Sequence, residues 1–382
     1  MFTMLDEVYS SLETVSPLRT NMKAFIQRLI ILALGILTAV LPSQAQVSSG
    51  ILWDKNFGGS NDDILFALQP AHDGGYLLGG HSLSAASGNK TNVSFGGYDY
   101  WVIKIDTNGN KAWEKIFGGS SGESLYAVQQ TSDGGYVLGG NSASDVSGNK
   151  TDVKFGIFDF WIVKIDAAGN KTWDKSFGGS SSDELRCLLE TSDGGYILGG
   201  ASLSPVSGNK TGTWFGSYDY WVVKIDAYGT KAWDKTFGGS GSDSLLSIQQ
   251  TSDGGYILVG SSQSTISGNK SSASFGSYDI WVVKIDSVGN KVWEKSFGGS
   301  GDDMFGGCLQ QTSDGGYILG GRSSSGTSGN KSATSFGAND GWVIKIDAVG
   351  NRLWDKSFGG LAEDQFSSLQ ATSDGDYVLE TV

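Results

Sequence analysis

Two neighbouring segments decide the fold: SLYAVQQTSDGGYVLGG at residues 124–140 and FWIVKIDAAGNKTWDKSF at residues 160–177. In each segment, two runs with apolar and aromatic residues flank a short stretch containing Asp and Gly, which favours a tight turn between strands. The pattern predicts one unit of four strands, at residues 124–131, 136–140, 160–166 and 171–177. No stretch after residue 45 shows a useful helical period, so an all-β fold is expected.

This unit is repeated along the chain. A Trp that opens a W-[DE]-K-x-F-G-G motif recurs every 60 residues, and once after 61, at Trp53, Trp113, Trp173, Trp233, Trp293 and Trp354. The D-G-G-Y turn recurs at Asp73, Asp133, Asp193, Asp253 and Asp314, and as D-G-D-Y at Asp374. Four antiparallel strands in each repeat predict a β-propeller of about six four-stranded blades. A parallel β-helix is the alternative, although its coils are usually shorter.

The phase of the repeat predicts how the blades are composed. Five copies contain all four strands. Gly50–Gly59 supplies only a fourth strand and Asp364–Leu379 only a first and a second, so we expect a last, composite blade built from N- and C-terminal strands. The alternative is a reading frame that stops within a repeat. The first strand is predicted to be innermost because its central residue is small in every copy: Ala67, Ala127, Cys187, Ser247, Cys308 and Ser368.

The composition excludes several classes of protein. The chain has 382 residues with 58 Gly and only 4 Pro, and its 12 Trp, 14 Tyr and 18 Phe are more than a disordered acidic tail carries. A formal net charge of −13 argues against nucleic acid or an anionic membrane surface as a partner. Two Cys exclude a disulfide-based scaffold, and Cys187 and Cys308, two blades apart, are expected to be free thiols.

The N-terminal sequence is typical of an exported protein. A basic segment at residues 22–28, an uncharged apolar run at residues 29–40 and small residues before Gln46 predict a secretory signal peptide cleaved after Ala45. The apolar run is shorter than the ~20 residues of a membrane span, and a retained anchor is the alternative. The expected organisation is 1–21 as a start placed too early or an extension, 22–45 as the signal peptide, and 46–382 as one propeller domain. We therefore expect a secreted or cell-surface protein with no membrane span after cleavage.

The repeated strings resemble those of a known group. T-S-D-G-G-Y-[IV]-L-G-G, D-Y-W-V-V-K-I-D and W-[DE]-K-x-F-G-G resemble the repeat arrays of secreted bacterial propeller proteins common in Bacteroidetes, over residues 50–382. More distantly, Y-[IV]-L-G-G followed by I-D and Trp is similar to kelch repeats. The string I-D-x-x-G-N-x-x-W is similar to the tryptophan motif of quinoprotein dehydrogenase propellers. The resemblance implies a propeller fold and no particular function.

The strand order places the tight turns on one face and the two longer connections on the other, which we call the long-loop face. Long loops on a rigid scaffold are where binding usually occurs. Three recurring sets of side chains on this face are, together with His81, the candidate ligand-binding residues. They are the acids Asp63, Glu123, Asp183, Asp243 and Asp303, with Asp364 in the last copy; the lysines Lys90, Lys150, Lys210, Lys270 and Lys331; and the aromatic residues Tyr98, Phe158, Tyr218 and Tyr278, replaced by Asn339 in the fifth copy.

Each set also has a structural interpretation. The acids follow Gly-Gly-Ser, where a carboxylate commonly caps a turn, and one acid per blade falls short of the six to eight oxygen ligands of calcium, so no metal site is expected. The loop lysines are expected to be solvated loop tips rather than a ligand ring. A second set of lysines within the third strand, Lys104, Lys164, Lys224, Lys284 and Lys345, is predicted to pair with Asp99, Asp159, Asp219, Asp279 and Asp340.

Catalysis normally needs an asymmetric set of residues. The residues that the repeat does not explain are His72, His81, Arg186, Glu190, Asp145 and Asp152. The two histidines lie near opposite ends of one strand, which argues against a metal site between them. No cofactor is expected. The sequence favours a non-catalytic propeller that binds a glycan or a surface protein. A carbohydrate-active enzyme of glycoside hydrolase or lyase type on the same scaffold and a structural fragment of a longer surface protein are the alternatives.

Overall fold

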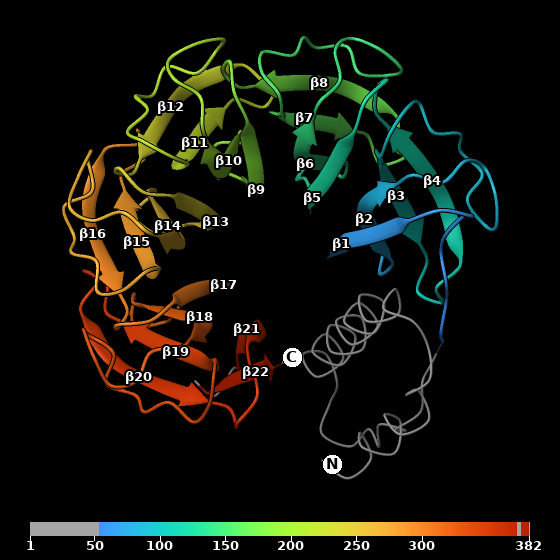
Figure 1. Ribbon diagram of the computed structural model, residues 1–382. Coiled ribbons are helices and arrows are strands. Elements are labelled where there is room, and N and C mark those ends of the chain that lie inside the picture. Colours follow the sequence, from blue (N-terminus) through green and yellow to red (C-terminus); the bar gives the residue numbers. More distant parts are fainter. Residues whose placement is uncertain (1–52, 373–375, 382) are drawn as a thin grey trace. The chain divides into compact units, whose positions relative to one another are not determined.

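The computed structural model describes residues 53–372 and 376–381 (Figure 1). Every strand given below lies within the unit Lys55–Val382. Residues 1–21 and the expected signal peptide with its cleavage site lie outside the described residues. In the described ranges the regular secondary structure is β-strand, as expected for an all-β fold. No helix in these ranges is long and apolar enough to cross a membrane.

Five sheets of four antiparallel strands follow one another along the chain, and we number them blades 1 to 5. Their first strands are β1 (Asp63–Pro70), β5 (Glu123–Gln130), β9 (Asp183–Glu190), β13 (Asp243–Gln250) and β17 (Asp303–Gln311). Their second strands are β2 (Tyr76–Ser82), β6 (Tyr136–Ser142), β10 (Tyr196–Ser202), β14 (Tyr256–Ser262) and β18 (Tyr317–Ser323). Their third strands are β3 (Asp99–Ile105), β7 (Asp159–Ile165), β11 (Asp219–Ile225), β15 (Asp279–Ile285) and β19 (Asp340–Ile346). Their fourth strands are β4 (Lys111–Phe117), β8 (Lys171–Phe177), β12 (Lys231–Phe237), β16 (Lys291–Phe297) and β20 (Arg352–Phe358).

Tight turns between these strands follow from the Asp and Gly residues of the repeat. In blade 2 the Asp133 carboxylate accepts a hydrogen bond from the Gly135 N–H at 2.9 Å, and Gly134 has a φ of 82°, which glycine adopts at low cost. In the next turn the Asp166 carboxylate accepts the Asn170 N–H at 2.8 Å. The four strands predicted from residues 124–177 are confirmed, with every end within two residues of its predicted position.

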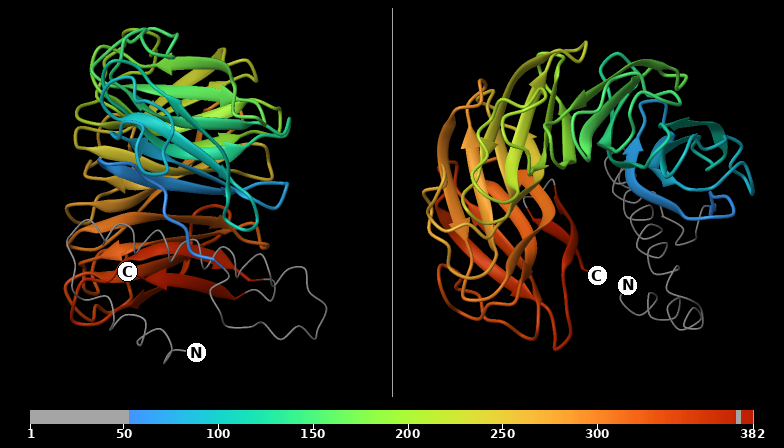
Figure 2. Two further views of the ribbon diagram at one scale, coloured as in Figure 1. Left: turned by 90° about the vertical axis from the view of Figure 1, so that its right-hand side faces the viewer. Right: turned by 45° about the horizontal axis from the view of Figure 1, so that its top comes forward.

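Successive blades pack face to face (Figure 2). Aromatic side chains lie between them. Trp161 of β7 is fully buried and packs on Tyr100 of β3, with ring centroids 4.8 Å apart, and the Tyr100 hydroxyl donates to the Trp161 carbonyl at 3.0 Å. Trp113 on the outer β4 lies edge to face with Tyr136 of blade 2, with ring centroids 6.4 Å apart, and Trp173 and Trp354 make the same contact in their blades. The first strands are innermost, as predicted (Figure 1). This arrangement is a β-propeller.

Each third strand carries a buried lysine whose partner differs from the predicted one. The Lys164 ammonium contacts the Asp133 carboxylate of the D-G-G-Y turn at 2.8 Å. The equivalent pairs are Lys104–Asp73, Lys224–Asp193, Lys284–Asp253 and Lys345–Asp314. The predicted pairing with Asp99, Asp159, Asp219, Asp279 and Asp340 is wrong. Those acids begin the strand that carries the lysine, and five residues along a strand span roughly 16 Å and change the face.

The last sheet contains two strands in the described residues, β21 (Phe366–Ala371) and β22 (Tyr377–Thr381). The sequence predicts a fourth strand for this composite blade from Gly50–Gly59. Of that segment, residues 53–59 form no strand, and the rest lies outside the described residues. The physical reason is that the fourth strand of each complete blade pairs with a third strand, which this sheet does not contain among the residues described.

This shorter sheet leaves part of blade 5 exposed. Phe358 at the end of β20 is 41% exposed, whereas Phe297 at the same position of blade 4 is 3% exposed. Phe297 belongs to a buried cluster that includes Trp342 from the third strand of the next blade. Phe358 contacts Phe366 of β21, with ring centroids 5.9 Å apart, but β21 and β22 bring no third-strand tryptophan to cover it.

Substituting alanine for Phe297 or for Phe358 measures how much packing by the following sheet contributes to the free energy of unfolding at each position. Phe297→Ala should lower the free energy of unfolding by about 3–5 kcal/mol, the usual cost of truncating a buried phenylalanine. Phe358→Ala should cost less than half as much, because its ring is already partly in water. Urea unfolding followed by circular dichroism provides the comparison. Equal losses in the two variants would show that a further strand covers Phe358 in solution.

Candidate functional site

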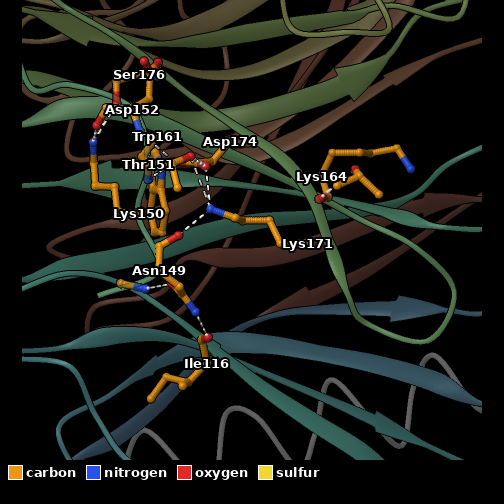
Figure 3. Close-up of polar contacts among 12 residues, drawn as sticks. Ile116, Asn149, Lys150, Thr151, Asp152, Trp161, Lys164, Lys171, Asp174 and Ser176 are labelled. Carbon is orange, nitrogen blue, oxygen red and sulfur yellow. Dashed lines mark hydrogen bonds and ion pairs between the residues drawn. The ribbon is translucent and has the colours of Figure 1, made fainter. Parts of the chain in front are cut away.

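The S-G-N-K loops of the long-loop face are held by their own lysines (Figure 3). Lys150 is 2% exposed, and its ammonium donates hydrogen bonds to the Asp152 carbonyl and, at 2.9 Å, to the Ser176 hydroxyl. The same ammonium lies 5.9 Å from the centroid of the Trp161 ring. Burial lowers the pKa of the Lys150 ammonium, against the attraction of nearby carboxylates. The equivalent Lys90, Lys210, Lys270 and Lys331 are equally buried. The expectation of solvated loop tips is wrong, because these ammonium groups satisfy oxygen atoms inside the protein.

The residue before this lysine fastens the loop to the preceding blade. The Asn149 side-chain amide donates to the Ile116 carbonyl at 2.8 Å and accepts the Gly118 N–H at 2.9 Å, both at the end of β4 (Figure 3). Gly148 makes the approach feasible, because it has a φ of 58° and a Cβ there would lie 2.4 Å from the Gly118 carbonyl oxygen. The loop therefore belongs structurally to two blades at once.

A buried carboxylate holds the other side of the loop. Asp174 of β8 accepts hydrogen bonds from the Thr151 N–H at 2.9 Å and the Trp161 indole N–H at 3.0 Å, and pairs with Lys171 at 2.6 Å (Figure 3). Burial alone raises the pKa of Asp174, but the hydrogen bonds from Lys171 and Thr151 outweigh it and hold the pKa at about 2. Asp174 is thus ionised and fully engaged at neutral pH.

The ring of acids is placed inside the loops. Asp183 is fully buried, and its carboxylate accepts the Gly179 N–H at 2.8 Å and the Ser204 hydroxyl at 2.8 Å. A glycine N–H contacts the carboxylate in the same way at Asp63, Glu123, Asp243, Asp303 and Asp364. This geometry is that of a turn cap, so the acids organise the long-loop face from within.

A second buried carboxylate lies beside five of these acids, from Glu123 to Asp364, across the blade boundary. Asp159 at the start of β7 accepts the Phe155 N–H at 2.6 Å through Oδ2, while its buried Oδ1 has no hydrogen-bond partner. A Cβ on Gly178 would lie 2.0 Å from Asp159 Oδ1 and 3.0 Å from Asp183 Oδ2, so both carboxyl groups converge on this glycine. Burial, reinforced by the charge of Asp183, raises the pKa of Asp159 to about 7, against the Phe155 N–H and the Lys150 ammonium.

The same pair recurs around the propeller. Burial raises the pKa of Asp99 to about 6 and of Asp219 to about 7, and also raises that of Asp279. Each faces the acid of the next blade, Glu123, Asp243 and Asp303 respectively. Two carboxylates in so little water favour one proton between them. The folded chain therefore retains protons near neutral pH that the unfolded chain releases.

The stability of the protein should consequently depend on pH in an unusual direction. The stability that a protonated Asp159 contributes is complete below its ordinary pKa of 3.8 and is lost as the pH rises through about 7. Relative to the parent, Asp159→Asn should reduce the loss of unfolding free energy between pH 5 and about 7, by up to about 1.4 kcal/mol per pH unit, because in that range the folded parent keeps a proton that its unfolded chain has released. Denaturant unfolding of both proteins at several pH values provides the test.

A matched variant removes one charge from the same blade without touching the pair. Asp145 is exposed on the adjoining loop, and Asp145→Asn should keep the pH dependence of the parent. Burial lowers the pKa of His81 to about 4, so below pH 6.5 this group makes the stability rise with pH, opposite to Asp159. The contribution of His81 cancels in the comparison because the parent and both variants carry it. Identical pH profiles for Asp159→Asn and the parent would refute the shared proton.

The position of Tyr98, Phe158, Tyr218 and Tyr278 makes the same backbone hydrogen bond in every blade, but its side chains differ in their contacts. In all five blades the backbone carbonyl of this residue accepts the N–H of the next acid of the ring. The Tyr98 hydroxyl donates to Asp62 at 3.2 Å, and the Tyr218 hydroxyl donates to Glu184 at 2.9 Å. Phe158 is exposed and Tyr278 is half-buried. These four residues therefore do not form a uniform aromatic ring.

His81 lies near the long-loop end of β2 among aromatic rings. Its ring centroid is 5.1 Å from that of Phe66 and 5.0 Å from that of Tyr98. Burial lowers the pKa of His81 to about 4, so the imidazole is neutral at physiological pH. At the same position of blade 2, Asn141 instead accepts the Leu185 N–H of the next blade at 2.6 Å. The structure thus joins two predicted site residues, His81 and Tyr98, through packing.

Sequence reasoning missed two aromatic residues of this region. Phe66 of β1 and Tyr126 of β5 have ring centroids 5.3 Å apart, and the Arg186 guanidinium of β9 lies 4.7 Å from the Tyr126 centroid. Arg186 also forms an ion pair with Glu184 at 2.5 Å. Phe66, Tyr126 and Arg186 occupy the same position in three successive repeats. The signal in the sequence is a position that changes chemical class from copy to copy beside residues that hardly vary.

The tight-turn face has a hollow of about 520 Å³ between blades 1 and 2, lined by residues that include Lys104, Trp113 and Tyr136. Lys104 is already paired with Asp73 at 2.8 Å. Among the residues the structure describes, no group of three His, Cys, Asp or Glu side chains could hold a metal ion. Cys187 and Cys308 are free thiols, as expected, and burial raises the pKa of the Cys187 thiol.

Comparison with known proteins gives distant similarities. No family model matches the chain. The regulatory protein FlaEY of Caulobacter vibrioides is 23% identical over 291 residues, which are 70% of this chain and 30% of that protein, so this chain spans less than a third of the relative's length. A protein of unknown function from Bacteroides caccae is 10% identical, covering 77% of this chain and 82% of its own, with a TM-score of 0.39. The WD40 domain of Neurospora crassa Pan2 is also 10% identical, covering 82% and 84%, with a TM-score of 0.42.

Proposed function

We propose that the protein is an exported β-propeller that acts as a non-catalytic binding scaffold, with a glycan or a surface protein as its partner. One observation carries this proposal. The repeated charged side chains of the long-loop face are bonded within the chain, whereas unlike side chains, among them Tyr126 and Arg186, gather on blades 1 to 3. A partner bound in one orientation needs such an unlike set on a regular scaffold.

The chemistry of this set supports binding more than catalysis. His81 is buried and neutral, with a pKa of about 4, which suits packing better than general base catalysis at neutral pH. Arg186 and Glu184 neutralise each other. The net charge of −13 disfavours nucleic acid as the partner. The likeness of the repeat strings to secreted bacterial arrays, and the N-terminal sequence, support export to the cell surface or beyond.

Export gives the first test of this proposal. When the full chain is expressed in a bacterium, the exported product should begin at Gln46, as read by mass spectrometry of its N-terminal peptide. Ala45→Leu should block this cleavage, because signal peptidase requires a small residue before the cut. An uncleaved chain that stays in the cytoplasm would contradict export while leaving the propeller fold untouched.

Partner binding gives the second test. The exported chain, immobilised on a sensor, should bind intact cells of the bacterium that naturally encodes it. The double variant with Arg186→Ala and Tyr218→Ala should bind these cells at least tenfold less. Tyr228 is 79% exposed beside Gly229 in a tight turn, and Tyr228→Ala is the matched control that should bind like the parent. Periodate treatment of the cells should abolish binding to a glycan, and protease treatment should abolish binding to a protein.

Two results would overturn this function. Binding that is equal in the parent and the double variant would remove the unlike set from the interaction. Release of cleaved saccharide from the cells would instead favour the carbohydrate-active enzyme.

A further inference from the structure

Each first strand contains a β-bulge close to its long-loop end. In β5 the pairing with β6 passes from Leu125 directly to Ala127, so Tyr126 is an extra residue without a partner in the ladder. The same irregularity occurs in β1, β9, β13, β17 and β21. Bulges re-aim a side chain and are common beside binding sites. Here they lie on the innermost strand of every blade (Figure 1).

The repeat keeps the bulge but changes its side chain. The extra residues of blades 1 to 4 are Phe66, Tyr126, Arg186 and Leu246. In blade 5 the bulge contains Gly306 and Gly307, which accounts for the one tryptophan spacing of 61 residues. Gly307 has a φ of 89°, and a Cβ there would meet no atom within 4 Å. The row of side chains thus ends in open space at blade 5.

Three of these side chains form a continuous surface, which we call the bulge row: Phe66, Tyr126 and Arg186. The phenyl and phenol rings are 5.3 Å apart, and the guanidinium lies 4.7 Å from the phenol centroid, within the range of a cation–π contact. Phe66 is 43% exposed, and the Arg186 side chain is 33% exposed. The row therefore offers two ring surfaces and a planar donor group to solvent across three blades.

Hydroxyl and carboxylate groups line the same region. One carboxylate oxygen of Glu184 forms the ion pair with Arg186, and the other accepts a hydrogen bond from the Tyr218 hydroxyl at 2.9 Å. The Glu184 side chain is 27% exposed, so it can also accept a hydrogen bond from outside. The ion pair has no net charge, and the chain as a whole carries −13. A strongly anionic ligand is therefore disfavoured at this place.

We propose that the bulge row binds a neutral oligosaccharide, whose sugar rings lie on Phe66 and Tyr126 and whose neighbouring hydroxyl groups bond Arg186 and Glu184. Sugar rings present apolar C–H faces that pack on aromatic rings, while their hydroxyl pairs match planar donors and acceptors such as guanidinium and carboxylate. An extended, shallow row suits a chain of sugars better than a small compact ligand, which needs an enclosing pocket. This inference rests on the proposed binding function and names its ligand class.

Titration calorimetry with cellohexaose, chitohexaose and mannohexaose, and with hexagalacturonate as the anionic probe, tests the inference. At least one neutral hexasaccharide should bind the exported chain, and Tyr126→Ala should weaken that binding about tenfold or more, as expected for a central aromatic contact. Tyr126→Phe retains the ring and should bind within about twofold of the parent, which separates stacking from loss of the hydroxyl. Tyr228→Ala should bind like the parent, and every variant should keep the parent's unfolding midpoint.

Three outcomes of the calorimetry would overturn the inference: no binding of the neutral probes, binding of hexagalacturonate alone, or equal binding by Tyr126→Ala and the parent. The proposed function fails separately, through the experiment on intact cells. Cell binding that resists periodate but not protease would retain the scaffold function and reject the oligosaccharide.

Discussion

Face-to-face packing of one sheet on the next is the constraint on which the rest of the structure depends. A lone four-stranded sheet of this repeat would leave both of its apolar faces in water. Trp161 is fully buried because Tyr100 of the preceding blade covers its ring, and its indole N–H reaches Asp174 within its own blade. The sheet that follows blade 5 has two strands among the described residues, and there Phe358 is left partly exposed. Each blade thus completes the core of its neighbour.

This packing forces charged groups into the interior and requires each to find a partner. An unpaired buried charge costs several kcal/mol, whereas a paired and hydrogen-bonded one is tolerated. Lys150 meets this demand with a carbonyl and a hydroxyl, and Asp174 with an ion pair and several N–H groups. Asp159 has a hydrogen-bond donor at Oδ2 and none at Oδ1, and burial raises the pKa of this carboxyl group to about 7. Loops held in this way form a firm frame on which a few unlike side chains can be displayed.

Local patterns in the sequence predicted the strands, the turns and the inner position of the first strand, because each depends on residues adjacent in the chain. Pairings between distant segments were beyond them. Lys164 pairs with Asp133, 31 residues away, because the hairpin register brings the strand end beside the first turn. The burial of Lys150 depends on a tryptophan and a serine from later strands. Phe66 and Tyr126 were not predicted as site residues, because the extra residue of a bulge is defined by its pairing with a second strand, which the sequence of one strand does not give.

The bulge explains why variation gathers where it does. One position of the inner hairpin leaves no room for a side chain: a Cβ on Gly140 would lie 2.0 Å from the Ser124 carbonyl oxygen. An extra residue outside the ladder is different, because its replacement does not alter the register of the strands. Freedom to vary alone would scatter unrelated side chains around the axis. Instead Phe66, Tyr126 and Arg186 touch in sequence across three blades, and Gly306 and Gly307 leave the fifth bulge bare. Contact among unlike neighbours, rather than variability itself, is what distinguishes a binding surface from an unconstrained one.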